Sequence, residues 1–492
     1  AFREFFLLSL LLVDIREFFA DTESDGDRMK KTLSRLPRVV RLAVLSAVLL
    51  ALCSKSSPLY AFNDWMDANI FFTMGKSMLS GKVLYRDVFD HKGPVLYLLY
   101  GLGWLLDHTG FTGVFVLELC AFALFLDFGL RTVALLRGTP LHPAWCLLPA
   151  AAVAACRAFA HGGSAEELLL PFLAAALYSL AKCLADPRKM PLRAVVLHGF
   201  LCGCALLLKY TVLGFYLAWA VVLAVLYLRR GWLRDLGKSC AAYLGGLALA
   251  ALPWFAYFGV NHALDSWWEC YFYDNLFLYK DDTRSALTLA QHLWWAVRDD
   301  LPAALLLAVF LLWAVAANHR GAALATLVLA AGLAFTSLMG GYLVYYGLVL
   351  AVFAPLALAA LPQKRPAGRG FAVLPALGAA AAAAWCFLVS PNRALRGRAA
   401  ESLPQIQFAN IIRETPNATL LNYGTLDGGF YTAAGVLPPC RYFCVTNMPL
   451  QEQWQQQWDL LAGIVEEQRK SGVDIHMISA EEACKLEPNL AK

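Results

Sequence analysis

A series of apolar segments, each roughly 17–25 residues long, recurs along this chain from residue 39 to residue 390. Each segment is long enough to cross roughly 30 Å of hydrocarbon as an α-helix. Hydrophobic residues make up 59% of the 492 residues and charged residues 16%. Soluble domains instead have about 45–50% apolar and about 25% charged residues. The sequence therefore predicts an all-α polytopic membrane protein.

Short clusters of Lys and Arg set the expected orientation, because basic residues collect in cytoplasmic loops. If all these clusters lie in the cytoplasm, the N-terminus is cytoplasmic and the C-terminus is outside the cell. The chain then crosses the membrane about 11 times, and at most about 13 times. The net charge of +5 is spread over these loops, so it indicates no nucleic-acid partner. The predicted crossings lie near residues 39–56, 113–136, 142–159, 166–184, 192–208, 210–228, 239–259, 301–317, 321–338, 343–361 and 371–390.

One further apolar stretch, residues 95–106, is too short for an ordinary crossing. We interpret it as an interfacial helix that lies along the membrane. A short true crossing is the alternative, and it would move every later basic loop to the outside.

The chain divides into three predicted regions. Residues 1–28 are expected to be a non-native or disordered extension, because Met29 with its basic flank resembles a natural start. Residues 29–390 form the transmembrane domain, with a large first outer loop at 57–112. Residues 391–492 are expected to form a small extracytoplasmic α/β domain. Its predicted strands are 418–424, 440–445 and 473–479, with an amphipathic helix at 449–472.

The first outer loop concentrates charge in residues 63–94, between two apolar regions. Charged groups beside a bilayer are costly unless they have a use, so this loop is the predicted active site. Among its ionisable residues are Asp64, Asp67, Lys82, Arg86, Asp87, Asp90, His91 and Lys92.

Asp67 follows Asp64 by three residues, so a helix here would place both carboxylates on one face near its start. The helix dipole alone stabilises carboxylates at that position. The functional alternative is a general base that takes a proton from an acceptor.

Lys92 either extends its ammonium group to the headgroups or holds a lipid phosphate. Lys209 interrupts an apolar segment at its outer end, and two outer lysines fit an anionic lipid ligand.

Two further outer segments contribute candidate residues. Glu166, in the segment HGGSAEE, is either a site residue or an ordinary first-turn charge with Ser164 as the helix cap. Tyr345 and Tyr346, in GGYLVYYG, either belong to the interfacial aromatic belt or face the site. No residue spacing indicates zinc.

Three segments of the chain together resemble the GT-C glycosyltransferases, in particular bacterial members related to protein O-mannosyltransferases and to the lipid A aminoarabinose transferase. DANIFFTMGKSMLSGKVLYRDVFDHKGPVLYLLYGLGWLL is similar to their first outer loop. LCGCALLLKYTVLGFYLA and HGGSAEELLLPF resemble two later segments of the same group. The resemblance covers roughly residues 29–390. It implies a GT-C-like bundle and a sugar donor carried on a polyprenyl phosphate.

The resemblance also implies roles for individual residues. Asp67 matches the catalytic aspartate of the family, and Lys92 and Lys209 match contacts to the lipid phosphate, although Gly93 separates Lys92 from the proline. Glu166 stands where some relatives carry an acidic residue. Ala68 follows Asp67, so the Asp-Glu pair of many members is absent, and neither a cofactor nor a divalent metal is expected to be required.

The predicted function is therefore that of an inverting glycosyltransferase in the bacterial cytoplasmic membrane, with its site on the outer face. It would move a sugar from a polyprenyl phosphate to a glycan, lipid or protein acceptor. Asp64, Asp87, Asp90 and His91 are candidate substrate contacts or ion-pair partners. The alternatives are a transporter or flippase of lipid-linked sugars, which would carry charge at mid-membrane, and a non-catalytic family member.

Overall fold

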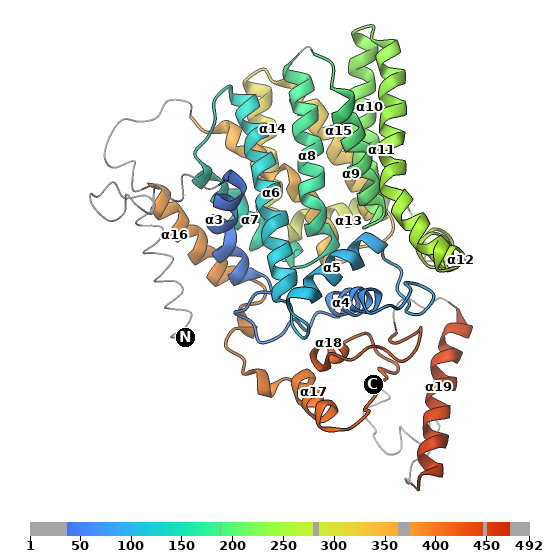
Figure 1. Cartoon of the computed structure of the whole chain (residues 1–492). Helices are drawn as coiled ribbons and strands as arrows, with labels where there is room; N and C mark the ends of the chain where they lie inside the picture. The colour runs from blue at the N-terminus through green and yellow to red at the C-terminus, as the bar shows by residue number, and fades with distance from the viewer. Residues whose placement is uncertain (1–36, 187, 279–284, 363–373, 446–449, 473–492) are drawn as a thin grey trace.

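The computed structural model describes residues 37–186, 188–278, 285–362, 374–445 and 450–472 (Figure 1). The predicted extension at 1–28 and the predicted strand at 473–479 lie outside these residues.

Long helices packed side by side form the body of the molecule (Figure 1). Each of the eleven predicted crossings coincides with helical structure. The stretch 142–159 is divided into a 3₁₀ turn η1 (Pro143–Cys146), a short helix α7 (Leu147–Ala154) and a second turn η2 (Arg157–Phe159). The other segments are α3 (Arg38–Cys53), α6 (Thr112–Arg137), α8 (Ala165–Ala185), α9 (Leu192–Leu206), η3 with α10 (Tyr210–Val212 and Leu213–Arg229), α11 (Leu233–Val260), α14 (Leu301–Ala316), α15 (Arg320–Leu338), η5 (Val344–Ala360) and α16 (Leu374–Val389).

The outer surface of the bundle is apolar, as expected of a multi-pass membrane protein. On α11, the side chains of Leu244, Leu252 and Phe255 are all more than half exposed. Among the described residues, five helices are long and apolar enough to cross a membrane. A sixth crossing arises if α14 is joined to α13 (Ala286–Asp299), which meets it at 98°. The predicted count of eleven crossings is larger than this, because the remaining apolar helices are short.

The centre of the bundle is occupied by η5, a 3₁₀ helix whose side chains are nearly all buried. A 3₁₀ helix rises about 2.0 Å per residue, so its 17 residues extend roughly 34 Å, comparable to the thickness of the hydrocarbon core. Small residues on the neighbouring helices permit close packing here. A Cβ atom on Gly129 of α6 would lie 2.6 Å from Cβ of Pro355.

Two helices of the first outer loop, α4 (Met66–Leu79) and α5 (Pro94–Leu106), lie across one end of the bundle (Figure 1). We call this the loop end. The two helices touch through glycines, because a Cβ on Gly75 would lie 2.4 Å from the Tyr97 carbonyl oxygen. The position of α5 agrees with an interfacial helix for residues 95–106.

The C-terminal region also lies at the loop end, where it packs directly on α4. It contains α17 (Pro404–Glu414), α18 (Phe430–Ala434) and α19 (Gln451–Lys470) (Figure 1). Lys76 of α4 is buried, and its ammonium group donates to the carbonyl oxygens of Tyr431 (2.9 Å) and Val436 (2.6 Å). Thr73 donates to the Asp427 carboxylate at 2.8 Å.

The helix predicted at 449–472 is confirmed as α19, but the strands predicted at 418–424 and 440–445 are wrong. Their backbone groups are satisfied by other partners. The Tyr431 hydroxyl accepts from the Asn422 N–H at 2.9 Å and donates to the Phe443 carbonyl at 3.0 Å. The Arg441 carbonyl accepts from the Phe89 N–H of the first outer loop at 2.9 Å. These hydrogen bonds replace the strand-to-strand hydrogen bonds that a sheet of residues 418–424 and 440–445 would require.

We expect Lys76→Met to loosen the C-terminal region from α4. The substitution keeps the length of the side chain but leaves two carbonyl groups without their donor, at a cost of about 1–3 kcal/mol. Limited proteolysis should cut residues 391–445 faster in this variant than in the wild type. Lys470→Met, at an exposed position of α19, is the control, and equal cleavage rates in the two variants would contradict the prediction.

Candidate active site

Gly93 fixes the start of α5 against the chain between α9 and η3. The Gly93 N–H donates to the Leu208 carbonyl at 3.3 Å, and the Val95 N–H donates to the Leu207 carbonyl at 3.0 Å. A Cβ on Gly93 would lie 2.0 Å from the Leu207 carbonyl oxygen, so no other residue fits. This contact brings the neighbouring residues Lys92 and Lys209 to the same place.

Asp90, His91 and Lys92 form a short hydrogen-bonded chain. The Lys92 ammonium lies 2.6 Å from His91 Nε2, and His91 Nδ1 lies 3.0 Å from Asp90 Oδ1. Asp90 also accepts from the Tyr97 hydroxyl at 2.7 Å. Burial and the Lys92 charge lower the pKa of His91. A neutral His91 that donates from Nδ1 to Asp90 can accept from Lys92 at Nε2, so the chain orients the ammonium group.

The Asp90 carboxylate stays ionised within this chain. Burial alone would raise the pKa of Asp90, but its interaction with His91, the Lys92 charge and the hydrogen bond from Tyr97 hold the pKa below its usual range. Asp90 is thus a structural partner of His91 that orients the imidazole ring.

Several residues without a sequence signal hold the Lys92 backbone. The Tyr85 hydroxyl donates to the Lys92 carbonyl at 2.7 Å, and the Lys92 N–H donates to the Tyr97 hydroxyl at 2.9 Å. Asn275 donates to the His91 carbonyl at 2.8 Å from η4 (Trp268–Leu278), a π-helix that follows the four-residue helix α12 (Leu264–Trp267). Their aromatic and amide side chains look like ordinary interfacial residues in the sequence.

Lys209 is buried between a carboxylate and two aromatic rings. Its ammonium group makes an ion pair with Glu166 Oε1, near the start of α8. It also lies 3.9 Å from the centre of the Tyr346 ring and 5.6 Å from that of Tyr345. Among the described residues, no group donates to the buried Oε2 of Glu166.

Asp67 lies in the first turn of α4 and is half-buried. The Tyr345 hydroxyl donates to Asp67 Oδ2 at 2.7 Å, so Tyr345 joins this carboxylate to the surroundings of Lys209. Asp67, Glu166 and Lys92 all lie close enough to Tyr346 for their charges to act on its hydroxyl. The structure thus assembles one group of predicted site residues from α4, α5, α8, the α9–η3 junction and η5. We call it the loop-end cluster: Asp67, His91, Lys92, Glu166, Lys209, Tyr345 and Tyr346.

Two predicted candidates have separate partners. Asp64 is 44% exposed and pairs with Lys55 at 2.6 Å. Asp87 pairs with Arg86 at 2.7 Å and accepts from the Val83 N–H at 2.7 Å, which closes a turn. The partners of both carboxylates lie outside the loop-end cluster, so the geometry favours ion-pair partners over substrate contacts for both.

His161 lies beside the loop-end cluster on the side of η2. Its ring centre is 5.2 Å from that of Trp65, and Trp65 in turn lies 5.2 Å from Tyr345. Burial, together with the nearby Lys55 charge, lowers the pKa of His161 to about 4. His161 is therefore neutral at pH 7.

Within the described residues, no group of three or more His, Cys, Asp or Glu side chains is arranged to hold a metal ion. The loop-end cluster has two carboxylates, Asp67 and Glu166, and each already has a donor from Tyr345 or Lys209.

The arrangement of the helices defines a multi-pass membrane protein with a GT-C-like fold. In a comparison of folds, ArnT from Cupriavidus metallidurans bound to undecaprenyl phosphate superposes with a TM-score of 0.58 and 16% sequence identity. The match covers 81% of this chain and 85% of that one. The apo state of the same ArnT gives a TM-score of 0.55, at 16% identity and with coverage of 81% and 84%. The resemblance to GT-C enzymes is thus confirmed for the fold.

A family model described as the competence-induced Ccs4 N-terminal domain matches residues 27–262, just under half of the chain. This range includes Asp67, Lys92, Glu166 and Lys209. No curated protein sequence matches the chain.

We expect Gly93→Ala to separate Lys92 from Lys209. The added methyl group would lie against the Leu207 carbonyl, so α5 must shift or the two hydrogen bonds to residues 207–208 must break. We predict a lower melting temperature than in the wild type, because either change removes hydrogen bonds that hold α5 against the bundle. Gly245→Ala in α11 is the matched control, because nothing lies within 4 Å of its Cβ position. An unchanged melting temperature in Gly93→Ala would contradict the role of this contact.

Stability should also fall as the pH is lowered from 6.5 towards 4. Between these values His161 binds a proton in the unfolded chain but stays neutral in the folded one, so acid favours unfolding by up to about 3 kcal/mol. His161→Gln should flatten this part of the curve of melting temperature against pH. An equal loss of stability in the variant would show that other groups cause it.

Proposed function

We propose that this protein is an integral-membrane glycosyltransferase that moves a sugar from a polyprenyl-phosphate donor to an acceptor. In this proposal the chain crosses the cytoplasmic membrane about 11 times, and the loop end faces the extracytoplasmic side. The observation that carries the proposal is the loop-end cluster, in which one carboxylate and two lysines from distant parts of the chain meet at the end of the bundle.

Asp67 is the proposed general base. Tyr345 donates to its Oδ2, and no described residue donates to its Oδ1. The Tyr345 hydroxyl fixes the orientation of the carboxylate and leaves one oxygen to take the proton of an acceptor hydroxyl or amine. Attack by the acceptor on the sugar carbon, opposite the phosphate, would then invert the configuration at that carbon.

Lys92 and Lys209 are the proposed phosphate ligands. The Asp90–His91 pair directs the Lys92 ammonium, and the rings of Tyr345 and Tyr346 hold that of Lys209. Both charges would stabilise the negative charge that grows on the departing lipid phosphate. A phosphate leaves readily, so the proposal needs neither a general acid nor a cofactor. Glu166 keeps Lys209 in place until the donor phosphate binds.

The fold supports a lipid-linked donor. ArnT, which shares the fold, has been solved with undecaprenyl phosphate bound. The sugar and the acceptor are left open by this proposal.

The test uses purified protein and a panel of radiolabelled undecaprenyl-phosphate sugars, with loss of label from the lipid and donor binding as the two readouts. Asp67→Asn should keep donor binding but lower transfer by about 10²–10⁴-fold, the usual contribution of a general base. Lys92→Ala should weaken donor binding itself. Asp64→Asn is the matched control, because Asp64 lies three residues before Asp67, outside α4, and pairs with Lys55, so the variant should retain transfer.

Undiminished transfer in Asp67→Asn would remove this residue from the mechanism. Donor binding without any release of label, in every extract supplied as a source of acceptor, would contradict a transferase and favour a transporter of the same lipid.

A further inference from the structure

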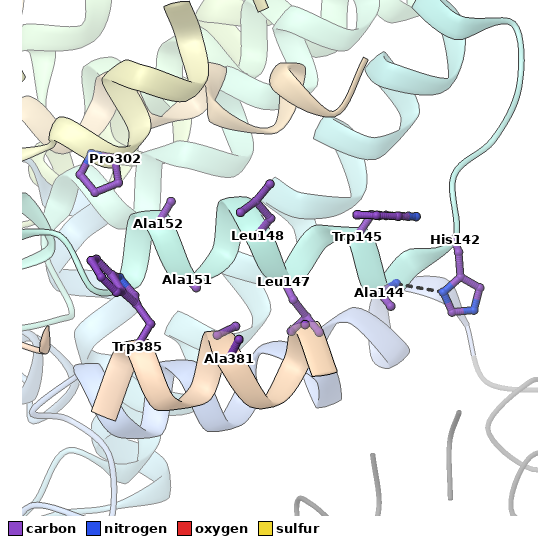
Figure 2. Close-up of a pocket in the computed structure, with 12 residues that line it drawn as sticks. His142, Ala144, Trp145, Leu147, Leu148, Ala151, Ala152, Pro302, Ala381 and Trp385 are labelled. Atoms are coloured by element: carbon purple, nitrogen blue, oxygen red, sulfur yellow. Dashed lines mark hydrogen bonds between the residues drawn. The ribbon is translucent and has the colours of Figure 1, made fainter. Parts of the chain in front are cut away.

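An apolar groove of about 540 Å³ runs along the side of the bundle, away from the loop-end cluster. Its walls are α7, α16 and the start of α14, and its floor is made of small side chains such as Ala151, Ala152 and Ala381 (Figure 2). Trp145 lies towards one end and Trp385 towards the other (Figure 2). The lining is almost wholly apolar and the groove is open at the surface, so it is suited to a hydrocarbon chain.

In Figure 2, α16 lies alongside α7, and the lining residues follow both helices. The groove is therefore elongated along the direction of these helices. The wall formed by η1 and α7, Pro143–Ala154, is roughly 18 Å long at 1.5 Å per residue. The groove is thus a channel that follows one helix over several turns, with a volume in the usual range of ligand pockets.

Two arginines mark the end of the groove at Ala152 and Pro302. Arg157 lies five residues after Ala152, and Asp299 lies three residues before Pro302. The Arg157 guanidinium lies 3.3 Å from the Asp299 carboxylate, so this ion pair joins η2, which follows α7, to the end of α13, which precedes α14. Arg298 binds the same carboxylate at 2.9 Å.

The outward-facing charge at this end is positive. The side chains of Arg157 and Arg298 are 67% and 48% exposed, whereas that of Asp299 is fully buried beneath them. The Tyr342 hydroxyl also donates to Asp299, at 2.8 Å. The neighbouring Asp300 is buried, and burial raises the pKa of its carboxyl group. One carboxylate therefore holds two guanidinium groups that face outwards.

We propose that this groove and its two arginines form a binding site for an anionic membrane phospholipid. One acyl chain lies in the groove between α7 and α16, and the phosphate lies against Arg157 and Arg298. Guanidinium groups match the geometry of phosphate oxygens, and their position at the end of an apolar channel fits a charged headgroup on a hydrocarbon chain.

The phospholipid site uses different residues from the proposed donor site, and its headgroup end borders the loop-end cluster through Tyr342, three residues before Tyr345. Lys92 and Lys209 belong to the start of α5 and the end of α9, and neither element lines the groove. The inference does not depend on glycosyl transfer, because it rests on the groove and on the Asp299 ion pairs alone.

The experiment measures the melting temperature of the purified protein in detergent as lipid is added. Phosphatidylglycerol should raise the melting temperature more than phosphatidylcholine does. Arg157→Gln should raise the half-saturating concentration of phosphatidylglycerol at least about tenfold, because one guanidinium is lost, while Asp299 keeps Arg298 and Tyr342 as partners. Arg393→Gln, at an exposed position beyond α16, is the control for surface charge.

A second pair of variants tests the groove itself. Ala381→Trp fills the groove and should abolish the response to phosphatidylglycerol, whereas Ala384→Trp, on the same helix but outside the groove, should keep it. Equal responses to the two phospholipids in the wild type would overturn the proposal. So would an Ala381→Trp variant that keeps its response to phosphatidylglycerol but loses its response to undecaprenyl phosphate, because the groove would then hold the polyprenyl chain.

Discussion

The contact between Gly93 and the backbone of Leu207 and Leu208 connects the loop end to the helix bundle. It requires a residue without a side chain, and it joins segments more than a hundred residues apart through two hydrogen bonds. Because Lys92 precedes this contact and Lys209 follows it, the same two bonds also bring two ammonium groups together. Cations repel each other, so their proximity depends on compensation by His91 on one side and by Glu166 and the tyrosine rings on the other.

The sequence predicted the features of this arrangement that depend only on residues close together in the chain. Apolar segments predicted helices at every position where they occur, and the lysine that interrupts one of them made Lys209 a candidate site residue. The sequence could not predict which residues from distant parts of the chain lie close together in space. Tyr345 donates to Asp67 across 278 residues of chain, and Asn275 supports His91 from a π-helix. In the sequence, an aromatic or amide side chain near a membrane surface looks the same whether it lies at the membrane interface or supports a site residue.

The C-terminal region shows the limit of short patterns. Residues 418–424 and 440–445 were predicted to be strands, but their backbone groups bond to Tyr431, to the first outer loop and, from Val445, to the carbonyl of Thr425 just beyond the first segment. A strand needs a partner along its whole length, and here α4 provides a competing surface. In the same way, nothing in the composition of residues 344–360 distinguishes a 3₁₀ helix from an α-helix. The choice depends on how closely neighbours such as Gly129 approach.

The contact of Lys76 with Tyr431 and Val436 has a consequence for the path of the whole chain. Both partners are polar segments outside the bundle, so they must lie on the same side of the membrane. The chain between them therefore crosses an even number of times. The ten segments predicted between residues 113 and 390 satisfy this parity, whereas an additional crossing by α5 would make the number odd. One pair of hydrogen bonds thus restricts the topology of a stretch whose ends, Lys76 and Tyr431, are 355 residues apart, and a chain with one helix inserted the wrong way could not form these bonds.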